Sequence, residues 1–281
     1  MSNYWSVMPA MLDDLVLNKS LFLIGLLMIA ALLLTKECGY WIGFRNTKQA
    51  AAAAEKQEKT VGTITGAMLA LLGFMLAIAI SMADGHFESR RKLILDEANA
   101  IGTSHLRARA IGGPHGEKIA HLLIDYTQLR LDFFDAGEDQ KRLKLVYRQT
   151  AEVQQQIWNH ASAIAKAAPT PTSAILLTSL NEVFDLATSR RWALEVRVPP
   201  SIIKLLFAFS LLSMGILGYY FGICGFRHPI LSLFLIIAFT ATILLIIDLN
   251  RPRSGLIQPE QSHIVWILGD MKTSALEAPV R

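Results

Sequence analysis

A cluster of charged residues directly follows a long uncharged stretch of the sequence. Glu88, Lys92 and Asp96 recur every four residues, and Arg90 and Arg91 stand among them. On a helix this spacing gives pairs of opposite charge one turn apart, which stabilise an exposed helix by a few tenths of a kcal/mol each. Alternatively, Arg90, Arg91 and Lys92 form a basic ring at the inner mouth of a membrane conduit, where they would attract anions.

A second charged cluster, Asp248, Arg251 and Arg253, follows the last apolar stretch. An Asp at the C-terminal end of a helix faces the negative end of the helix dipole, so it needs a positive partner. Arg251, Arg253, Arg90 and Arg91 are the candidates. The cluster is either a terminator at the membrane surface, whose arginines bind lipid head groups, or a structural latch between the last span and the long polar insert.

The sequence shows no pattern typical of an enzyme, a metal centre or a cofactor site. The seven histidines include no H-E-x-x-H motif and no repeated ligand spacing with Cys or Asp. Phosphate-binding glycine loops and the G-x-S-x-G motif do not occur. Cys38 and Cys224 fall at the same expected membrane face, where free thiols and a disulfide are both open. We therefore expect no catalytic residue, no metal and no cofactor.

A stripe of small residues occupies the uncharged stretch before the first charged cluster. Its members follow at steps of three or four residues, which keeps them near one helix face: Gly62, Gly66, Ala70, Gly73, Ala77 and Ser81. The stripe is either a close-packing face or, in a symmetric ring of such helices, the wall of a narrow conduit. In a conduit, the constriction would lie among Gly73, Phe74, Ala77, Ile78 and Ser81.

The composition requires an integral membrane protein. Of the 281 residues, 52% are hydrophobic and only 18% are charged. The net charge of +4 is expected at lipid head groups, so we expect no nucleic-acid partner. Because backbone polar groups in lipid must be paired, each uncharged apolar run should be a helix that spans the bilayer. These runs are residues 20–35, 61–83, 205–226 and 229–247.

The polar insert between the second and third runs should be a helical bundle. No proline separates the second run from the polar sequence, so one helix should cross the membrane and continue into water. Apolar residues at helical spacing, interrupted at residues 112–114, 137 and 169–171, predict three further helices. Thr170 is the expected N-cap of the last of these helices, with Pro171 at its first position.

The expected fold class is therefore all-α, a polytopic membrane protein with four transmembrane helices and a helical-bundle insert between the second and third. The expected division is an N-terminal tail at 1–19, the first two spans within 20–83, the insert at 84–200, the last two spans within 201–249 and a C-terminal tail at 250–281. Both tails and the insert share one side of the membrane. Basic residues flank the spans on both sides, so the positive-inside rule leaves the orientation open.

Several of these segments together resemble the bestrophin-like family of membrane proteins. The resemblance rests on residues 61–67, 72–77, 87–91, 96–102 and 248–255, and it extends from about Val61 to Ile257. Bestrophins are pentameric anion channels in which the second transmembrane helix lines the pore and continues into a cytoplasmic helical domain. The acidic calcium clasp of the animal bestrophins has no counterpart here, since Asp270 and Glu277 are isolated, so calcium gating is not implied.

The resemblance implies a homo-oligomeric, bestrophin-like ion channel, a pentamer by analogy, that is permeable to a small anion such as chloride. Its pore-lining candidates would be Gly66, Ala70, Gly73, Phe74, Ala77, Ile78 and Ser81. It also implies a plasma or inner membrane location, contact with membrane lipids, and a cytoplasmic insert and termini. The alternative is a non-conducting membrane scaffold or sensor whose helical insert binds a partner protein.

Overall fold

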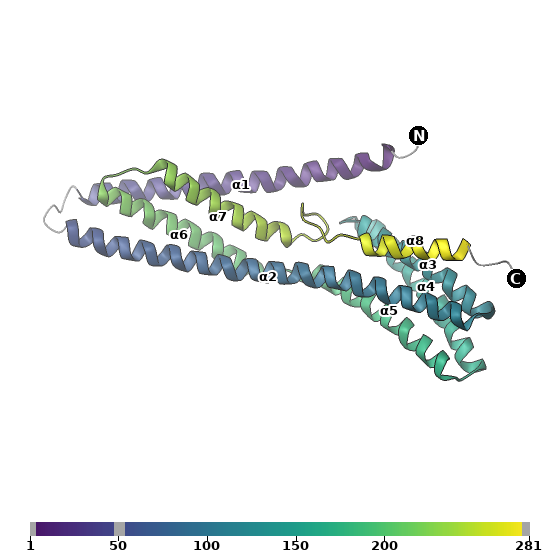
Figure 1. Cartoon of the computed structure of the whole chain (residues 1–281). Helices are drawn as coiled ribbons and strands as arrows, with labels where there is room; N and C mark the ends of the chain where they lie inside the picture. Colours follow the sequence, from purple (N-terminus) through teal and green to yellow (C-terminus); the bar gives the residue numbers. More distant parts are fainter. Residues whose placement is uncertain (1–3, 48–53, 277–281) are drawn as a thin grey trace. The chain divides into compact units, whose positions relative to one another are not determined.

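The computed structural model describes residues 4–47 and 54–276, and the side chains of residues 20–46 and 58–276. All regular secondary structure in this part of the chain is α-helical, as predicted (Figure 1). The helices are α1 (Tyr4–Thr47), α2 (Ala54–Ile111), α3 (Gly113–Asp135), α4 (Gln140–Ala167), α5 (Pro171–Glu195), α6 (Pro200–Cys224), α7 (Pro229–Leu249) and α8 (Ser262–Leu276).

Four stretches are long and apolar enough to cross a membrane, which confirms the predicted number of spans. They are Ser20–Asn46 in α1, Glu58–Ile111 in α2, Pro171–Cys224, which includes α6, and Pro229–Leu249, which is α7. The first two helices are longer than the apolar runs within them. α1 begins at Tyr4, well before the apolar run that starts at Ser20, and α2 continues to Ile111 without a break.

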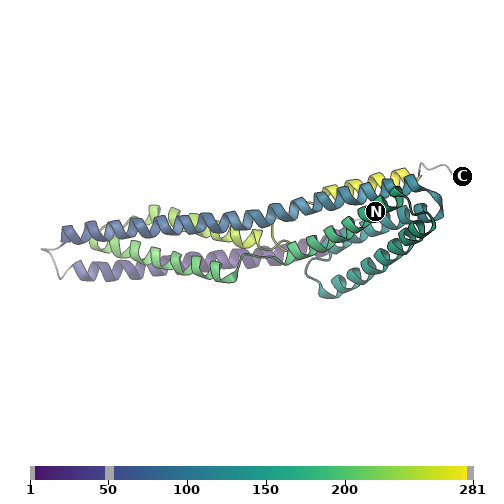
Figure 2. The same cartoon turned by 90° about the horizontal axis from the view of Figure 1, so that it is seen from below.

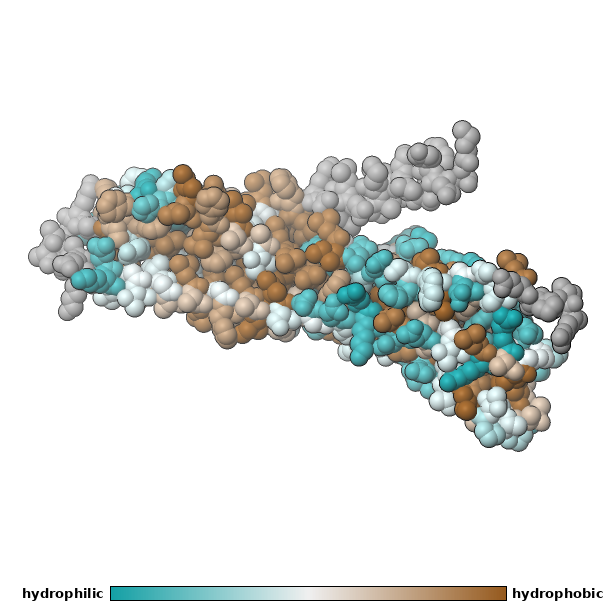
Figure 3. Space-filling view, in the orientation of Figure 1, coloured by the Kyte–Doolittle hydropathy of each residue, from teal (hydrophilic) through white to brown (hydrophobic). Residues whose placement is uncertain are grey.

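The chain forms two compact units. The membrane unit consists of residues 1–85, 197–251 and 255–257, and the polar unit consists of residues 86–196, 252–254 and 258–281. The boundaries after residues 85 and 196 lie within a few residues of the expected limits of the insert. In Figure 3 apolar side chains cover the visible face of the membrane unit, whereas the polar unit carries a mixed surface.

Within the membrane unit, glycines bring α1 and α6 into close contact. Gly39 and Gly43 lie one turn apart on α1, and Gly218 and Gly222 lie one turn apart on α6. A Cβ atom at Gly39 would overlap the carbonyl oxygen of Gly215, and one at Gly222 would lie 2.7 Å from the Phe44 nitrogen. This is the small-residue packing that lets membrane helices approach closely. From the sequence, such packing was an expectation for α2 alone.

In the polar unit, the second half of α2 packs with α3, α4, α5 and α8 around a main apolar cluster, and two smaller clusters lie beside it. The predicted N-cap is confirmed, since the Thr170 hydroxyl accepts a hydrogen bond from the Ser173 amide at 3.2 Å and Pro171 opens α5. The four expected helices are present. A fifth helix, α8, was not expected, because residues 250–281 were assigned to a tail. Ile264 and Met271 on α8 are buried in the unit.

Candidate functional site

The small residues of α2 point away from the rest of the chain. Five of them, Gly66, Ala70, Gly73, Ala77 and Ser81, are exposed, and we call them the small-residue face. A Cβ atom built on Gly66 or Gly73 would meet no atom within 4 Å. Within residues 20–46 and 58–276 nothing packs against this face, which leaves it open to lipid, another protein chain or water.

The opposite side of α2 is the side that packs. Leu72, Leu76, Ala79 and Ala83 are at most 5% exposed, and they recur at helical spacing. In Figures 1 and 2 the first half of α2 runs alongside α6, and the Tyr220 ring of α6 lies 3.1 Å from where a Cβ of Gly62 would be. Gly62, the sixth member of the stripe, thus lies at the edge of this contact.

Two large apolar side chains border the small-residue face. Phe74 is 63% exposed and Ile78 is 46% exposed, although both lie in the middle of an apolar span. They lie about 80° and 120° around the helix from Gly66, at 100° per residue, so they belong to the same exposed sector. Side chains of this size beside glycine and alanine could narrow a conduit at one level while leaving it open at others.

The basic cluster beyond the span is divided between the surface and the interior, which corrects the expected basic inner mouth. Arg90 is only 2% exposed. Its guanidinium donates hydrogen bonds to the carbonyl oxygens of Ala193 at 2.9 Å and Val196 at 2.6 Å. These carbonyls lie at the C-terminal end of α5, where no helical amide can pair with them and where a positive charge is favoured. Arg90 therefore caps α5.

The other residues of the charged cluster lie at the surface as a short ladder. Arg91 and Lys92 are exposed, and the Arg91 guanidinium lies 3.3 Å from the Glu88 carboxylate. Because both partners are more than half exposed, this pair contributes little to stability. This pair is three residues apart and so differs from the expected ladder of Glu88, Lys92 and Asp96 at steps of four.

Asp248 finds its partners in the backbone and not in the expected arginines. Its carboxylate accepts hydrogen bonds from the Leu256 amide at 2.7 Å and the Ile257 amide at 2.9 Å. The carboxylate lies at the C-terminal end of α7, where the helix itself offers carbonyl oxygens and no free amide to donate to it. These two backbone amides compensate its charge, so the Asp holds the following loop against the helix end. The expected ion pair of Asp248 with an arginine is wrong.

The two arginines of this cluster make separate contacts. Arg251 donates to the Ser20 hydroxyl of α1 at 3.3 Å, within the membrane unit. Arg253 donates to the Gly137 carbonyl at 2.9 Å and lies over the Phe133 ring at 4.3 Å, within the polar unit. Each arginine therefore anchors the loop after α7 to a different helix, which supports a structural role for the cluster.

A buried ion triad that the sequence analysis missed holds the polar unit together. The Glu97 carboxylate of α2 accepts a hydrogen bond from Arg130 Nε of α3 at 2.6 Å and one from Arg190 Nη1 of α5 at 2.7 Å. All three side chains are at most 4% exposed. Arg190 also donates to Gln261, immediately before α8. The triad thus ties three helices, α2, α3 and α5, to one carboxylate, and Arg190 extends the network to the residue before α8.

The charge balance of the triad explains its pKa behaviour. Burial alone would raise the pKa of the Glu97 carboxyl, but the Arg130 and Arg190 guanidiniums outweigh burial and hold this pKa below its usual range. The sequence contained a signal for the triad. Glu97 falls on the apolar stripe of Ile94, Ala98 and Ile101, where a charged residue must be paired if it is buried.

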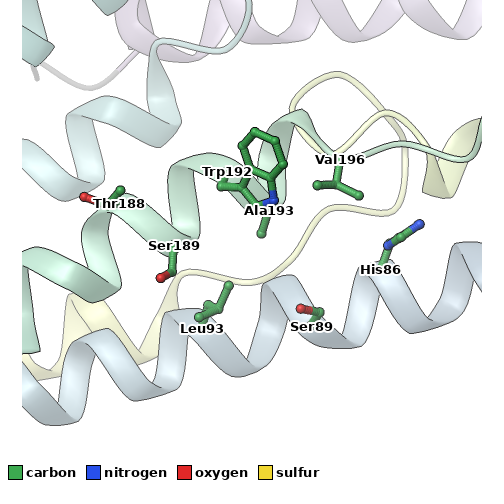
Figure 4. A pocket seen from close by; sticks show the side chains of 8 residues that line it. All are labelled: His86, Ser89, Leu93, Thr188, Ser189, Trp192, Ala193 and Val196. Atoms are coloured by element: carbon green, nitrogen blue, oxygen red, sulfur yellow. The ribbon is translucent and has the colours of Figure 1, made fainter.

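One cavity opens in the polar unit between α2 and α5. Its volume is about 550 Å³, within the range of small-molecule sites. Figure 4 shows side chains of both helices facing one another across it, with His86 at one end and Thr188 at the other. Trp192 in its wall is 68% exposed. The lining carries no carboxylate and no guanidinium, so it suits an apolar group better than an ion.

Other candidate chemistry is sparse in the described part of the chain. No group of three or more His, Cys, Asp or Glu side chains is placed to hold a metal ion there. Cys38 and Cys224 are free thiols in the structure.

Comparisons with known proteins identify the family and the fold of the chain. A family model described as "Bestrophin-like domain" matches residues 30–262. Two variant crystal structures of a bacterial bestrophin homologue from Klebsiella pneumoniae are similar in fold, with TM-scores of 0.60 and 0.64 and sequence identities of 16% and 18%. The matches cover 92% and 89% of this chain and 98% and 99% of those chains. No curated protein sequence matches the chain.

Proposed function

Since this chain belongs to the bestrophin-like family, we propose that it forms a homo-oligomeric ion channel in which α2 lines the pore. The observation that carries the proposal is the exposed small-residue face of α2, which none of the residues that the structure describes covers. A single chain cannot enclose a conduit with one helix face. Several copies around an axis can, and the pentamer of the bestrophins supplies the proposed number.

The α1 and α6 contact supports this use of the α2 face. Where the chain needs small residues for packing, at Gly39 and Gly222, the space that a Cβ would fill is already occupied by the other helix. At Gly66 and Gly73 that space is open. Small residues there keep the axis wide, and Phe74 and Ile78 form the proposed apolar constriction.

The exposed charges at the end of the span favour neither anions nor cations strongly. With Arg90 buried, Arg91 and Lys92 remain to attract chloride, while Asp84 and Glu88 on the same exposed sector of α2 attract cations. Two positive and two negative charges for each copy balance. We propose that anions such as chloride permeate, with a selectivity over potassium that stays small and depends on salt.

The family also supplies the proposed setting. We propose that the polar unit and both termini face the cytoplasm, with the membrane unit in the plasma or inner membrane and in contact with lipid. Labelling of a cysteine introduced at the exposed Gln140 from each side of sealed vesicles tests this orientation. Labelling from the outside alone would overturn it.

Flux measurements with matched variants test the pore assignment. The purified protein is reconstituted in liposomes, and chloride and potassium fluxes are recorded for wild type, Ala77→Trp and Ile78→Ala. The matched controls are Ala241→Trp and Ile237→Ala on α7, because Ile237 is 46% exposed, as is Ile78. We expect Ala77→Trp to abolish flux and Ile78→Ala to change it, while both controls behave as wild type. Absence of flux in the wild type would favour the non-conducting scaffold instead.

A further inference from the structure

Two histidines that are far apart in the sequence face each other in the polar unit. His115 lies at the start of α3 and His160 near the end of α4. Their Nδ1 atoms are 2.8 Å apart and their ring centroids 5.1 Å apart. His115 is exposed and His160 is partly buried, so solvent reaches the pair. The separation of 45 residues hid this pair from any search for sequence motifs.

This arrangement leaves one ring nitrogen without a proton. A neutral imidazole carries one N–H and one lone pair, so two Nδ1 atoms in contact can share a single proton. Partial burial lowers the pKa of His160, and the neighbouring His115 and Lys118 lower it further. The lowered pKa of His160 favours its neutral imidazole, which is the form that binds metals.

We propose that His115 and His160 form a two-histidine site for a divalent late first-row transition metal ion such as Ni²⁺, Cu²⁺ or Zn²⁺. Metal to imidazole bonds of about 2.0–2.1 Å place two neighbouring ligand nitrogens about 2.9–3.3 Å apart. The observed 2.8 Å is close to this range. Each ring must turn so that its lone pair points to a common centre, and the solvent-exposed position of His115 allows that turn.

The remaining coordination positions belong to water. No third His, Cys, Asp or Glu joins the pair among the residues that the structure describes, so the site is open and reversible. His115 and His160 lie at the open end of the hairpin formed by α3 and α4, whose other end is closed by residues 136–139. A bound ion would therefore link the two helices and stabilise the polar unit.

Nickel binding to the full-length, tag-free protein in detergent tests this proposal. Ni²⁺ is the chosen ion because it binds free cysteine thiols less readily than Zn²⁺ does. Binding is measured by isothermal titration calorimetry and by the shift in melting temperature. We expect the wild type to bind one equivalent of Ni²⁺ and to melt at a higher temperature in its presence. His115→Ala and His160→Ala should each lose both effects. The exposed controls His121→Ala and His263→Ala should keep both.

Two results would overturn the proposal. One is a wild type that binds no Ni²⁺. The other is binding of one equivalent of Ni²⁺ that persists in His115→Ala and His160→Ala. Circular dichroism of each variant shows whether the helices are intact, so that unfolding is not mistaken for lost ligation. As an independent readout, the electron paramagnetic resonance spectrum of Cu²⁺ bound to wild type should show hyperfine coupling to two nitrogens. A spectrum without nitrogen coupling would contradict the assignment.

Discussion

Replacing Glu97 with glutamine should strongly destabilise the polar unit. The Glu97 carboxylate is fully buried and lies 2.6 Å from Arg130 and 2.7 Å from Arg190. Glutamine keeps the shape, but it removes the only negative charge of the triad and directs an N–H₂ group at a guanidinium. Breaking a buried pair costs about 3–5 kcal/mol, because the remaining charge stays buried without compensation. For a unit of this size the melting temperature should fall by about 10 °C or more.

The assay is thermal unfolding of the detergent-solubilised protein, followed by circular dichroism. Glu152→Gln is the control, since the Glu152 and Arg148 side chains are both more than half exposed and lie 3.9 Å apart. Loss of an exposed pair changes stability by less than about 1 kcal/mol. A melting temperature of Glu97→Gln within about 2 °C of wild type would refute the role given to the triad.

The pH dependence of the same variant has a defined sign. The pKa of Glu97 is lowered in the folded state, so its contribution to stability is complete above the ordinary carboxyl pKa of about 4.3 and is lost as the pH falls toward the lowered value. The difference in melting temperature between wild type and Glu97→Gln should therefore be constant above about pH 5.5 and shrink below about pH 4. A difference that grows on acidification would contradict this assignment.

Four further substitutions test the contacts described above. Gly39→Ala should lower the melting temperature, because overpacking against α6 costs about 1–3 kcal/mol of stability. Gly73→Ala should leave stability unchanged or raise it slightly. Equal effects of the two substitutions on the melting temperature would contradict the exposure of the α2 face. Arg90→Gln should destabilise the end of α5, seen as faster amide hydrogen exchange near Ala193, and unchanged exchange there would argue against the cap. Asp248→Asn should cost about 1–2 kcal/mol through two weakened amide bonds, measured by thermal unfolding, and a neutral result would refute the loop anchor.

The helices could be predicted because their signals are local. Uncharged runs long enough for a bilayer marked the spans, and Gly112 and Thr170 marked helix boundaries in the polar unit. α8 was missed because its apolar residues, such as Ile264 and Met271, form a short stripe within a segment that was assigned to a tail. A 15-residue helix depends on its packing partner more than on its own sequence.

The candidate site was only partly predictable, because burial depends on contacts between distant segments. Spacing placed Gly66 and Gly73 on one face, but it could not tell whether that face packs or stays open. The sequence also placed Arg90 with its exposed neighbour Arg91, since nothing local indicated that the end of α5 would lie against it. The contact of His115 with His160 likewise requires the α3 and α4 hairpin to be formed.

The central claim is that the small-residue face of α2 lines an ion pathway, and cysteine accessibility tests it most directly. In a background of Cys38→Ser and Cys224→Ser, which removes both free thiols, Ala77→Cys and the α7 control Ala241→Cys are reconstituted in bilayers. A charged, water-soluble thiol reagent should block the current of Ala77→Cys and leave that of Ala241→Cys unchanged. A current that persists in labelled Ala77→Cys, or that is blocked equally in both variants, would contradict the account.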